Sequence, residues 1–153
     1  MGPSSGISAL AALGLLALPS VSLAQSSADT AAAWGLVGIW QVECGGTLGN
    51  GNPIYSYRTN GAQVILDRQF GSDLNDTNTI SGVRRLPTGA ITYSVVFQTT
   101  DPPQTREHIM VKSQDGRMMR AVSNRDVDTG TYSVQDGKFT SNGATTPWMN
   151  RCN

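Results

Sequence analysis

Residues 54–66, IYSYRTNGAQVIL, decide the fold because they form two short β-rich runs around one tight-turn signal. The dipeptide Asn60-Gly61 strongly favours a two-residue type I′ hairpin turn. A hairpin centred on this turn has one aromatic and aliphatic face and a second face that is polar except for Ile65. We therefore predict an antiparallel hairpin that buries its first face. Its predicted cross-strand pairs are Tyr57 with Val64, Tyr55 with Leu66 and Arg58 with Gln63.

Similar turn signals recur outward from this hairpin in both directions. Clusters of Gly, Asn, Asp and Pro separate short β-rich runs, and helical periodicity is absent apart from a short turn within residues 28–34. A long antiparallel meander removes its exposed edges by closing on itself. We therefore predict an all-β, eight-stranded antiparallel up-and-down β-barrel at residues 36–153. The runs expected to supply its eight or nine strands are residues 36–44, 53–59, 62–70, 77–86, 90–100, 105–113, 117–124, 130–135 and 138–149.

The run at residues 91–97 alternates apolar and polar side chains, which predicts a strand with Ile, Tyr, Val and Phe directed inward. The register with the following strand depends on whether the loop around Asp101-Pro102-Pro103 is odd or even in length. Because register follows burial, we predict the odd loop, which sets Phe97 opposite Ile109. His108 then points outward.

The composition limits the classes of function. The chain has 153 residues, the usual size of one domain. Its 11 Lys and Arg residues balance its 11 Asp and Glu residues, whereas nucleic-acid binders normally carry a basic excess. Two cysteines and one histidine are too few for a cysteine-rich scaffold or a zinc ribbon. We expect no nucleic-acid partner, no metal and no cofactor.

The first part of the chain has the layout of a secretory signal peptide. Residues 7–23 are small and apolar, and Ser22-Leu23-Ala24 places small residues at the positions read by signal peptidase. The run is too short for a comfortable membrane span, and a buried Ala/Leu helix is the alternative. We predict a signal peptide at residues 1–24 and an N-terminal arm at residues 25–35. The mature chain is then periplasmic or secreted and has no membrane span.

The two cysteines, Cys44 and Cys152, lie near the start and the end of the predicted domain. Export to an oxidising compartment favours a disulfide over two buried thiols. A metal pair has little support, because the only histidine is His108. A disulfide that closes so long a loop contributes about 4–5 kcal/mol from chain entropy. We therefore predict a Cys44–Cys152 disulfide that ties the two ends of the domain together.

The first predicted strand begins with Gly38-x-Trp40, and Arg151 lies near the end of the chain. This combination resembles the calycin superfamily, which comprises lipocalins, fatty-acid-binding proteins, avidins and bacterial metalloprotease inhibitors. The resemblance implies that Trp40 plugs the closed end of the barrel and that Arg151 packs across it. A guanidinium can stack on an indole face while it donates to nearby carbonyls. By this resemblance we expect a small, lipocalin-like bacterial protein.

No arrangement of residues indicates catalysis. A Ser-His-Asp triad needs its histidine in a cleft, whereas His108 is expected on the surface. The aspartates lie in or beside turns, which their side chains cap. Residues 73–76, DLND, contain oxygen ligands suited to calcium but lack EF-hand spacing. Neither a G-x-S-x-G motif nor a phosphate-binding glycine loop occurs. We expect no enzymatic activity.

The barrel interior is the remaining candidate for a functional site, and its inward residues either fill the core or line a pocket for one small molecule. Arg120 has two possible orientations. A two-residue turn at Asp115-Gly116 directs it inward, where it would anchor a carboxylate, and a three-residue turn places Met119 inward instead. The residues expected to contact a ligand are Tyr55, Tyr57, Tyr93, Phe97 and Arg120, with Val64, Leu66, Val95, Ile109 and Val111 also lining the pocket.

We expect an exported, monomeric, lipocalin-like protein that binds or sequesters a small hydrophobic molecule. One alternative is a protein-binding barrel such as a periplasmic protease inhibitor. In that case a flexible segment at residues 25–33 would enter the cleft of the enzyme, although the same segment equally fits a disordered terminus. The other alternative is a structural envelope protein without a small ligand. A hollow core supports the first function, and a filled core with an ordered N-terminal arm supports the protein-binding barrel.

Overall fold

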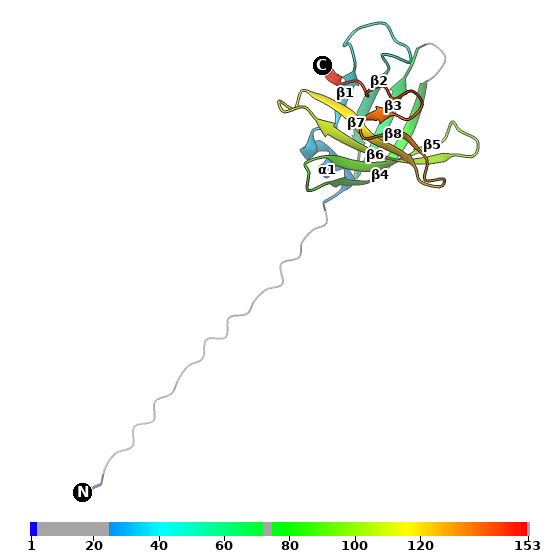
Figure 1. Cartoon of the computed structure of the whole chain (residues 1–153). Helices are drawn as coiled ribbons and strands as arrows, with labels where there is room; N and C mark the ends of the chain where they lie inside the picture. The colour runs from blue at the N-terminus through cyan, green and yellow to red at the C-terminus, as the bar shows by residue number, and fades with distance from the viewer. Residues whose placement is uncertain (3–24, 72–74, 153) are drawn as a thin grey trace.

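The structure, a computed structural model, describes residues 1–2, 25–71 and 75–152. Apart from one short helix, these residues form a closed eight-stranded antiparallel β-barrel of up-and-down topology (Figure 1). The predicted all-β barrel is therefore confirmed. The signal peptide predicted at residues 1–24 lies outside the described residues except for its first two.

Within the described residues, ten strands form one continuous antiparallel sheet. They are β1 (Gly38–Gln41), β2 (Ile54–Asn60), β3 (Gln63–Gln69), β4 (Asn75–Arg85), β5 (Ile91–Phe97), β6 (Gln104–Lys112), β7 (Met118–Asp126), β8 (Tyr132–Gln135), β9 (Lys138–Phe139) and β10 (Met149–Cys152). Neighbours pair in chain order from β1 to β9, and β10 pairs with both β1 and β7. The barrel therefore consists of β1 to β7 and β10, while β8 and β9 form a hairpin on β7. The long last strand predicted at residues 138–149 is absent, because β9 ends at Phe139 and β10 begins at Met149.

The β2–β3 hairpin keeps the predicted faces but not the predicted register. Asn60 pairs with Gln63, so Tyr57 lies opposite Leu66 rather than Val64. Gly61 has a φ of 58° and occupies the first position of the two-residue turn, which is the glycine position of a type II′ turn. The turn therefore lies one residue later in the chain than predicted, and the pairing register is shifted by two residues. Because side chains alternate with a period of two, this change leaves the inward and outward residues the same.

Helix α1 (Ser27–Trp34) differs from the expected N-terminal arm at residues 25–35, because most of this segment is helical and packed. Ser26 caps the helix by accepting a hydrogen bond from the Asp29 N–H at 3.1 Å. One face buries Ala28, Ala31 and Trp34, and the Trp34 indole N–H donates to the Gly89 carbonyl at 2.8 Å. This contact holds the helix against the β4–β5 turn. The segment is therefore part of the core and not a free arm.

The first and last strands close the same end of the barrel in the predicted way. Trp40 is fully buried, and its indole N–H donates to the Leu36 carbonyl at 2.8 Å. The Arg151 guanidinium carbon lies 5.8 Å from the centroid of the Trp40 ring, and Arg151 Nη2 donates to the Val37 carbonyl at 2.8 Å. Gly38 has a φ of 145°, and a Cβ there would lie 3.2 Å from Arg151 Nε. The glycine therefore leaves room for the arginine to cross the tryptophan.

The predicted disulfide is present between Cys44 and Cys152, whose Cα atoms are 5.6 Å apart. Cys152 pairs with Ile39 of β1, which is 40% exposed, so the disulfide lies on the outer face of the sheet. It joins the β1–β2 loop to β10. In the described part of the chain, no helix has the length and apolar character needed to cross a membrane.

Candidate functional site

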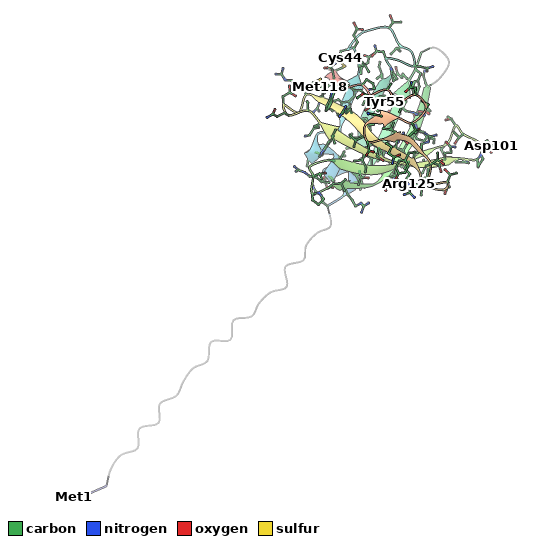
Figure 2. The ribbon with its side chains drawn as sticks, viewed as in Figure 1. Met1, Cys44, Tyr55, Asp101, Met118 and Arg125 are labelled. Carbon is green, nitrogen blue, oxygen red and sulfur yellow. A yellow bond between two sulfur atoms is a disulfide. The ribbon has the colours of Figure 1, made fainter. Side chains whose placement is uncertain are left out.

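A cavity of about 400 Å³ occupies the barrel at the end away from α1. Its lining reaches into the β1–β2 and β5–β6 loops and includes no residue of α1. In Figure 1, α1 lies at the lower left and the β1–β2 loop arches over the top. Figure 2 places Met118, beside the β6–β7 turn, and Asp101, in the β5–β6 loop, on opposite sides of the barrel. The lining residues are Val42, Asn50, Gly51, Pro53, Tyr55, Tyr57, Leu66, Arg68, Phe97, Thr100, Gln104, Arg106, His108, Met110, Ala121, Asn124, Val134, Phe139, Thr146, Pro147 and Met149.

Three of the predicted ligand contacts, Tyr55, Tyr57 and Phe97, line this cavity. Tyr93 does not line it but lies directly behind Tyr57, and the two hydroxyl oxygens are 2.8 Å apart. The two rings meet edge to face with centroids 6.1 Å apart. Burial raises the pKa of both tyrosines, which keeps their hydroxyls neutral. The aromatic part of the site is thus an uncharged wall backed by Tyr93.

Arg120 lies outside the cavity. Arg120 pairs with Val111, which is the pairing that the inward orientation of Arg120 required. Both side chains nevertheless point out of the barrel. The Arg120 guanidinium carbon lies 4.8 Å from the centroid of the Trp148 ring, which covers it. The prediction assumed that Val111 points inward. The observed register of β6 against β5 directs Val111 outward instead. Ile109, the second apolar residue assigned to the pocket from this strand, is outward for the same reason.

His108 is the clearest correction, because it points into the barrel and not toward solvent. Phe97 pairs with Gln104, and Tyr93 pairs with His108. The imidazole stacks on the Tyr93 ring with centroids 5.4 Å apart and planes 5° from parallel. The prediction failed because it assumed an apolar interior on every strand. The inward row of β6 is instead Gln104, Arg106, His108 and Met110.

Arg106 brings a positive charge into the cavity. Its Nη2 donates to Gln104 Oε1 at 3.1 Å, and its Nη1 donates to Ser133 Oγ at 3.4 Å. Both partners are neutral. Among the described residues, no carboxylate oxygen lies within 4.0 Å of the Arg106 guanidinium. Asp126 lies opposite Arg106 across the strand pair, and the charge of Arg106 contributes to the lowered pKa of Asp126. Asp126 Oδ1 accepts instead from the N–H groups of Asp128 and Thr129, so Arg106 forms no ion pair.

Arg68 differs from Arg106 because it is fully paired. Its Nε donates to Asp76 Oδ1 at 2.8 Å, and its Nη2 donates to Asp76 Oδ2. Burial alone would raise the pKa of Asp76, but the hydrogen bonds and charge of Arg68 lower it overall. The Arg68 guanidinium carbon also lies 4.2 Å from the centroid of the Phe97 ring. Asp76 therefore serves as the partner of Arg68. The calcium alternative at residues 73–76 begins outside the described residues.

Three polar side-chain atoms on β6 and β7 are buried and have no hydrogen-bond partner. Arg120 Nε is on the outer face, and His108 Nε2 and Asn124 Oδ1 are on the inner face. His108 and Asn124 face each other across the strand pair. Burial, together with the charges of Arg106 and Arg68, lowers the pKa of His108 to about 3. The imidazole is therefore neutral at physiological pH and can accept a hydrogen bond. Unpaired buried polar atoms are rare in folded proteins and indicate a missing partner.

Sequence reasoning missed Arg106, His108, Asn124 and Arg68 as site residues. The signal was available in Gln104, Arg106 and His108, which follow one another at the two-residue spacing of one strand face. A polar face on a barrel strand is compatible with an inward orientation when the interior is hollow. In the described part of the chain, no group of three or more His, Cys, Asp or Glu residues is arranged to hold a metal ion.

Comparisons of the chain with protein-family models, with curated proteins and with solved structures found no match. The function proposed below therefore depends on the geometry of the cavity.

Proposed function

We propose that this protein is an exported, lipocalin-like binding protein that holds a small amphipathic molecule in the open end of its barrel. The observation that carries the proposal is the Arg106 guanidinium, which lies in a cavity of about 400 Å³ without a carboxylate within 4.0 Å among the described residues. The Trp40–Arg151 closure supports the lipocalin-like assignment. The Cys44–Cys152 disulfide supports export, because disulfides persist in oxidising compartments.

The energetics of the interior favour a ligand over a permanently empty space. Burying a charge is costly unless it is paired and hydrogen-bonded. An anionic or acceptor group on a ligand would supply the direct ion pair that Arg106 does not form with Asp126, its cross-strand partner. The volume falls within the range of about 300–1,000 Å³ that is typical of small-molecule pockets. Tyr55, Tyr57 and Leu66 provide an apolar surface for the rest of the molecule.

Native mass spectrometry of the full chain, purified from the exported fraction of expressing cells, tests this function. We expect a bound small molecule that is lost on organic extraction and that is absent or much reduced in an Arg106→Gln variant. Arg58→Gln is the matched control, because Arg58 carries the same charge on the outer face and is exposed. A folded protein that carries no ligand and takes up no aromatic or aliphatic acid would contradict the proposal.

The protease-inhibitor alternative has less support, because it called for a filled core and the barrel is hollow at one end. The segment at residues 25–33, which would enter a protease cleft, is ordered and mostly helical in α1.

A further inference from the structure

Three polar residues of the cavity, Arg106, His108 and Asn124, face the interior from one side of the barrel. In the closed ring of strands, two strands separate β3 from β6 and two separate β7 from β2, so the β2–β3 wall lies opposite the β6–β7 wall. The β6–β7 wall carries Arg106, His108 and Asn124. The β2–β3 wall carries Tyr55 and Tyr57. The cavity is therefore divided along its length, with a polar side and an aromatic side.

The one charge on the aromatic side does not change this division. Arg68 lies on β3, but Asp76 neutralises it through two hydrogen bonds, and its guanidinium is stacked on Phe97. Arg106 on the opposite wall has only neutral partners. A ligand anion would therefore be attracted to Arg106 and not to Arg68.

The polar side also has an order along its length. Val95 pairs with Arg106, and Tyr93, which is two residues nearer the closed end, pairs with His108. His108 in turn pairs with Asn124. A strand rises about 3.4 Å per residue, so the level of Arg106 and the level of His108 and Asn124 are about 7 Å apart. The upper level donates hydrogen bonds. The lower level presents two unpaired atoms, Asn124 Oδ1, which accepts, and His108 Nε2, which donates or accepts according to the imidazole tautomer.

We infer that the ligand is a rigid, flat aromatic acid with its polar groups along one edge, not a chain molecule with a single polar head. This inference rests on the proposed function. The acidic group faces Arg106, and a hydroxyl about 7 Å deeper donates to Asn124 Oδ1 and accepts from His108 Nε2–H. The apolar face of the rings lies against Tyr55 and Tyr57. An alkyl acid would satisfy Arg106 but leave the two deeper polar atoms, Asn124 Oδ1 and His108 Nε2, unpaired.

Four probes separate these features by isothermal titration calorimetry on the folded protein. 6-Hydroxy-2-naphthoate carries an acid and a hydroxyl at opposite ends of a flat two-ring system. 2-Naphthoate lacks the hydroxyl, 2-naphthol lacks the acid, and dodecanoate is a chain acid without a donor group. We expect 6-hydroxy-2-naphthoate to bind about tenfold more tightly than each of the other three, because each lost hydrogen bond leaves a buried group unpaired.

Two variants assign the preference to the named residues. Asn124→Leu should remove the advantage of 6-hydroxy-2-naphthoate over 2-naphthoate and leave 2-naphthoate binding intact. Arg106→Met should remove its advantage over 2-naphthol. Arg58→Gln, on the outer face, should leave all four affinities unchanged.

The outcomes distinguish this inference from the proposed function. Dodecanoate binding as tightly as 6-hydroxy-2-naphthoate, or Asn124→Leu weakening both naphthoates equally, would overturn the flat aromatic acid but keep a binding cavity. Failure of all four probes to bind the folded protein would overturn both proposals.

Discussion

The two ends of the barrel are built from the same strands but differ in how their interiors are satisfied. At the closed end, Trp34 and Trp40 are 3% and 0% exposed, and both indole N–H groups donate to backbone carbonyls. At the open end, about 400 Å³ is empty, and His108 Nε2 and Asn124 Oδ1 have no partner. The difference shows that one end of the sheet encloses a packed core and the other end a cavity, where we propose that a ligand binds.

The charges follow the same division. At the closed end, Arg151 and Lys112 place their cationic groups over Trp40 and Trp34 and donate to the carbonyls of Val37 and Trp34. These contacts are complete within the chain. At the open end, Arg106 has only neutral partners among the described residues. A charge with complete contacts stabilises the fold, whereas Arg106 is available to a ligand.

The largest difference between the two ends should appear when an aromatic residue is truncated. Trp40→Ala should lower the free energy of unfolding by about 3–5 kcal/mol, because it opens a cavity in a fully packed region. Tyr55→Ala, at the open end, should cost clearly less because its ring already borders empty space. Urea unfolding of both variants measures this. Equal losses would mean that the two ends are packed alike.

The next effect concerns Gly38, where the backbone makes room for Arg151. Gly38→Ala should destabilise the protein by about 1–3 kcal/mol, because a Cβ at a φ of 145° is strained and would lie 3.2 Å from Arg151 Nε. Part of this loss should disappear when Arg151→Ala is already present, since the close contact is then gone. A thermal unfolding cycle of the two single variants and the double variant tests this coupling. Strict additivity would exclude a contribution from that contact.

The pH dependence of stability should report the open end through His108. Its pKa is about 3 in the folded protein, well below its unfolded value near 6.5. The unfolded chain therefore binds a proton first as the pH falls, and stability is lost from about pH 6.5 downward at no more than about 1.4 kcal/mol per pH unit. The lowered pKa values of Asp67 and Asp76 act only below about pH 4.

Two measurements check this assignment. Unfolding curves between pH 7 and 5 should slope in the wild type and flatten in His108→Gln. Because the chain has a single histidine, its NMR signals should stay those of a neutral ring down to pH 4.5. Titration of the native imidazole near pH 6.5 would show that it is solvated and not buried.

The smallest effect is expected on the outer face. The Arg58–Asp67 ion pair, at 2.7 Å, has an arginine side chain that is 52% exposed. Arg58→Gln should change the free energy of unfolding by no more than about 1 kcal/mol, as is usual for surface pairs. Urea unfolding at low and moderate salt measures this value. A larger loss would mean that the outer face contributes to the difference assigned here to the two ends.

Sequence reasoning was accurate where a local signal determines the geometry. Cys44 and Cys152 form the predicted disulfide, and Gly38, Trp40 and Arg151 lie together where the first and last strands pair. Helix α1 was harder to recognise because it is short and two of its three buried residues are alanines. Its stability comes from contact with the barrel, which no local pattern shows.

The site was harder to predict than the fold because its residues depend on the register between β5 and β6. Placing apolar residues inward on β6 moved His108 to the surface and Val111 to the interior. The preference for burial holds where the interior is packed and fails where it is a polar cavity. The orientation of Arg120 depended on the same register and is outward for the same reason.

Filling the cavity tests the central difference between the two ends most directly. Ala121 is an inward residue of β7 that lines the cavity opposite Met110, and Ala121→Phe would place a ring in the empty space. Urea unfolding and 2-naphthoate titration should be measured on the same samples. We predict an unfolding free energy equal to or above that of the wild type, together with loss of 2-naphthoate binding. An overpacking loss of about 1–3 kcal/mol with undiminished binding would show that the interior is filled and that any ligand binds elsewhere.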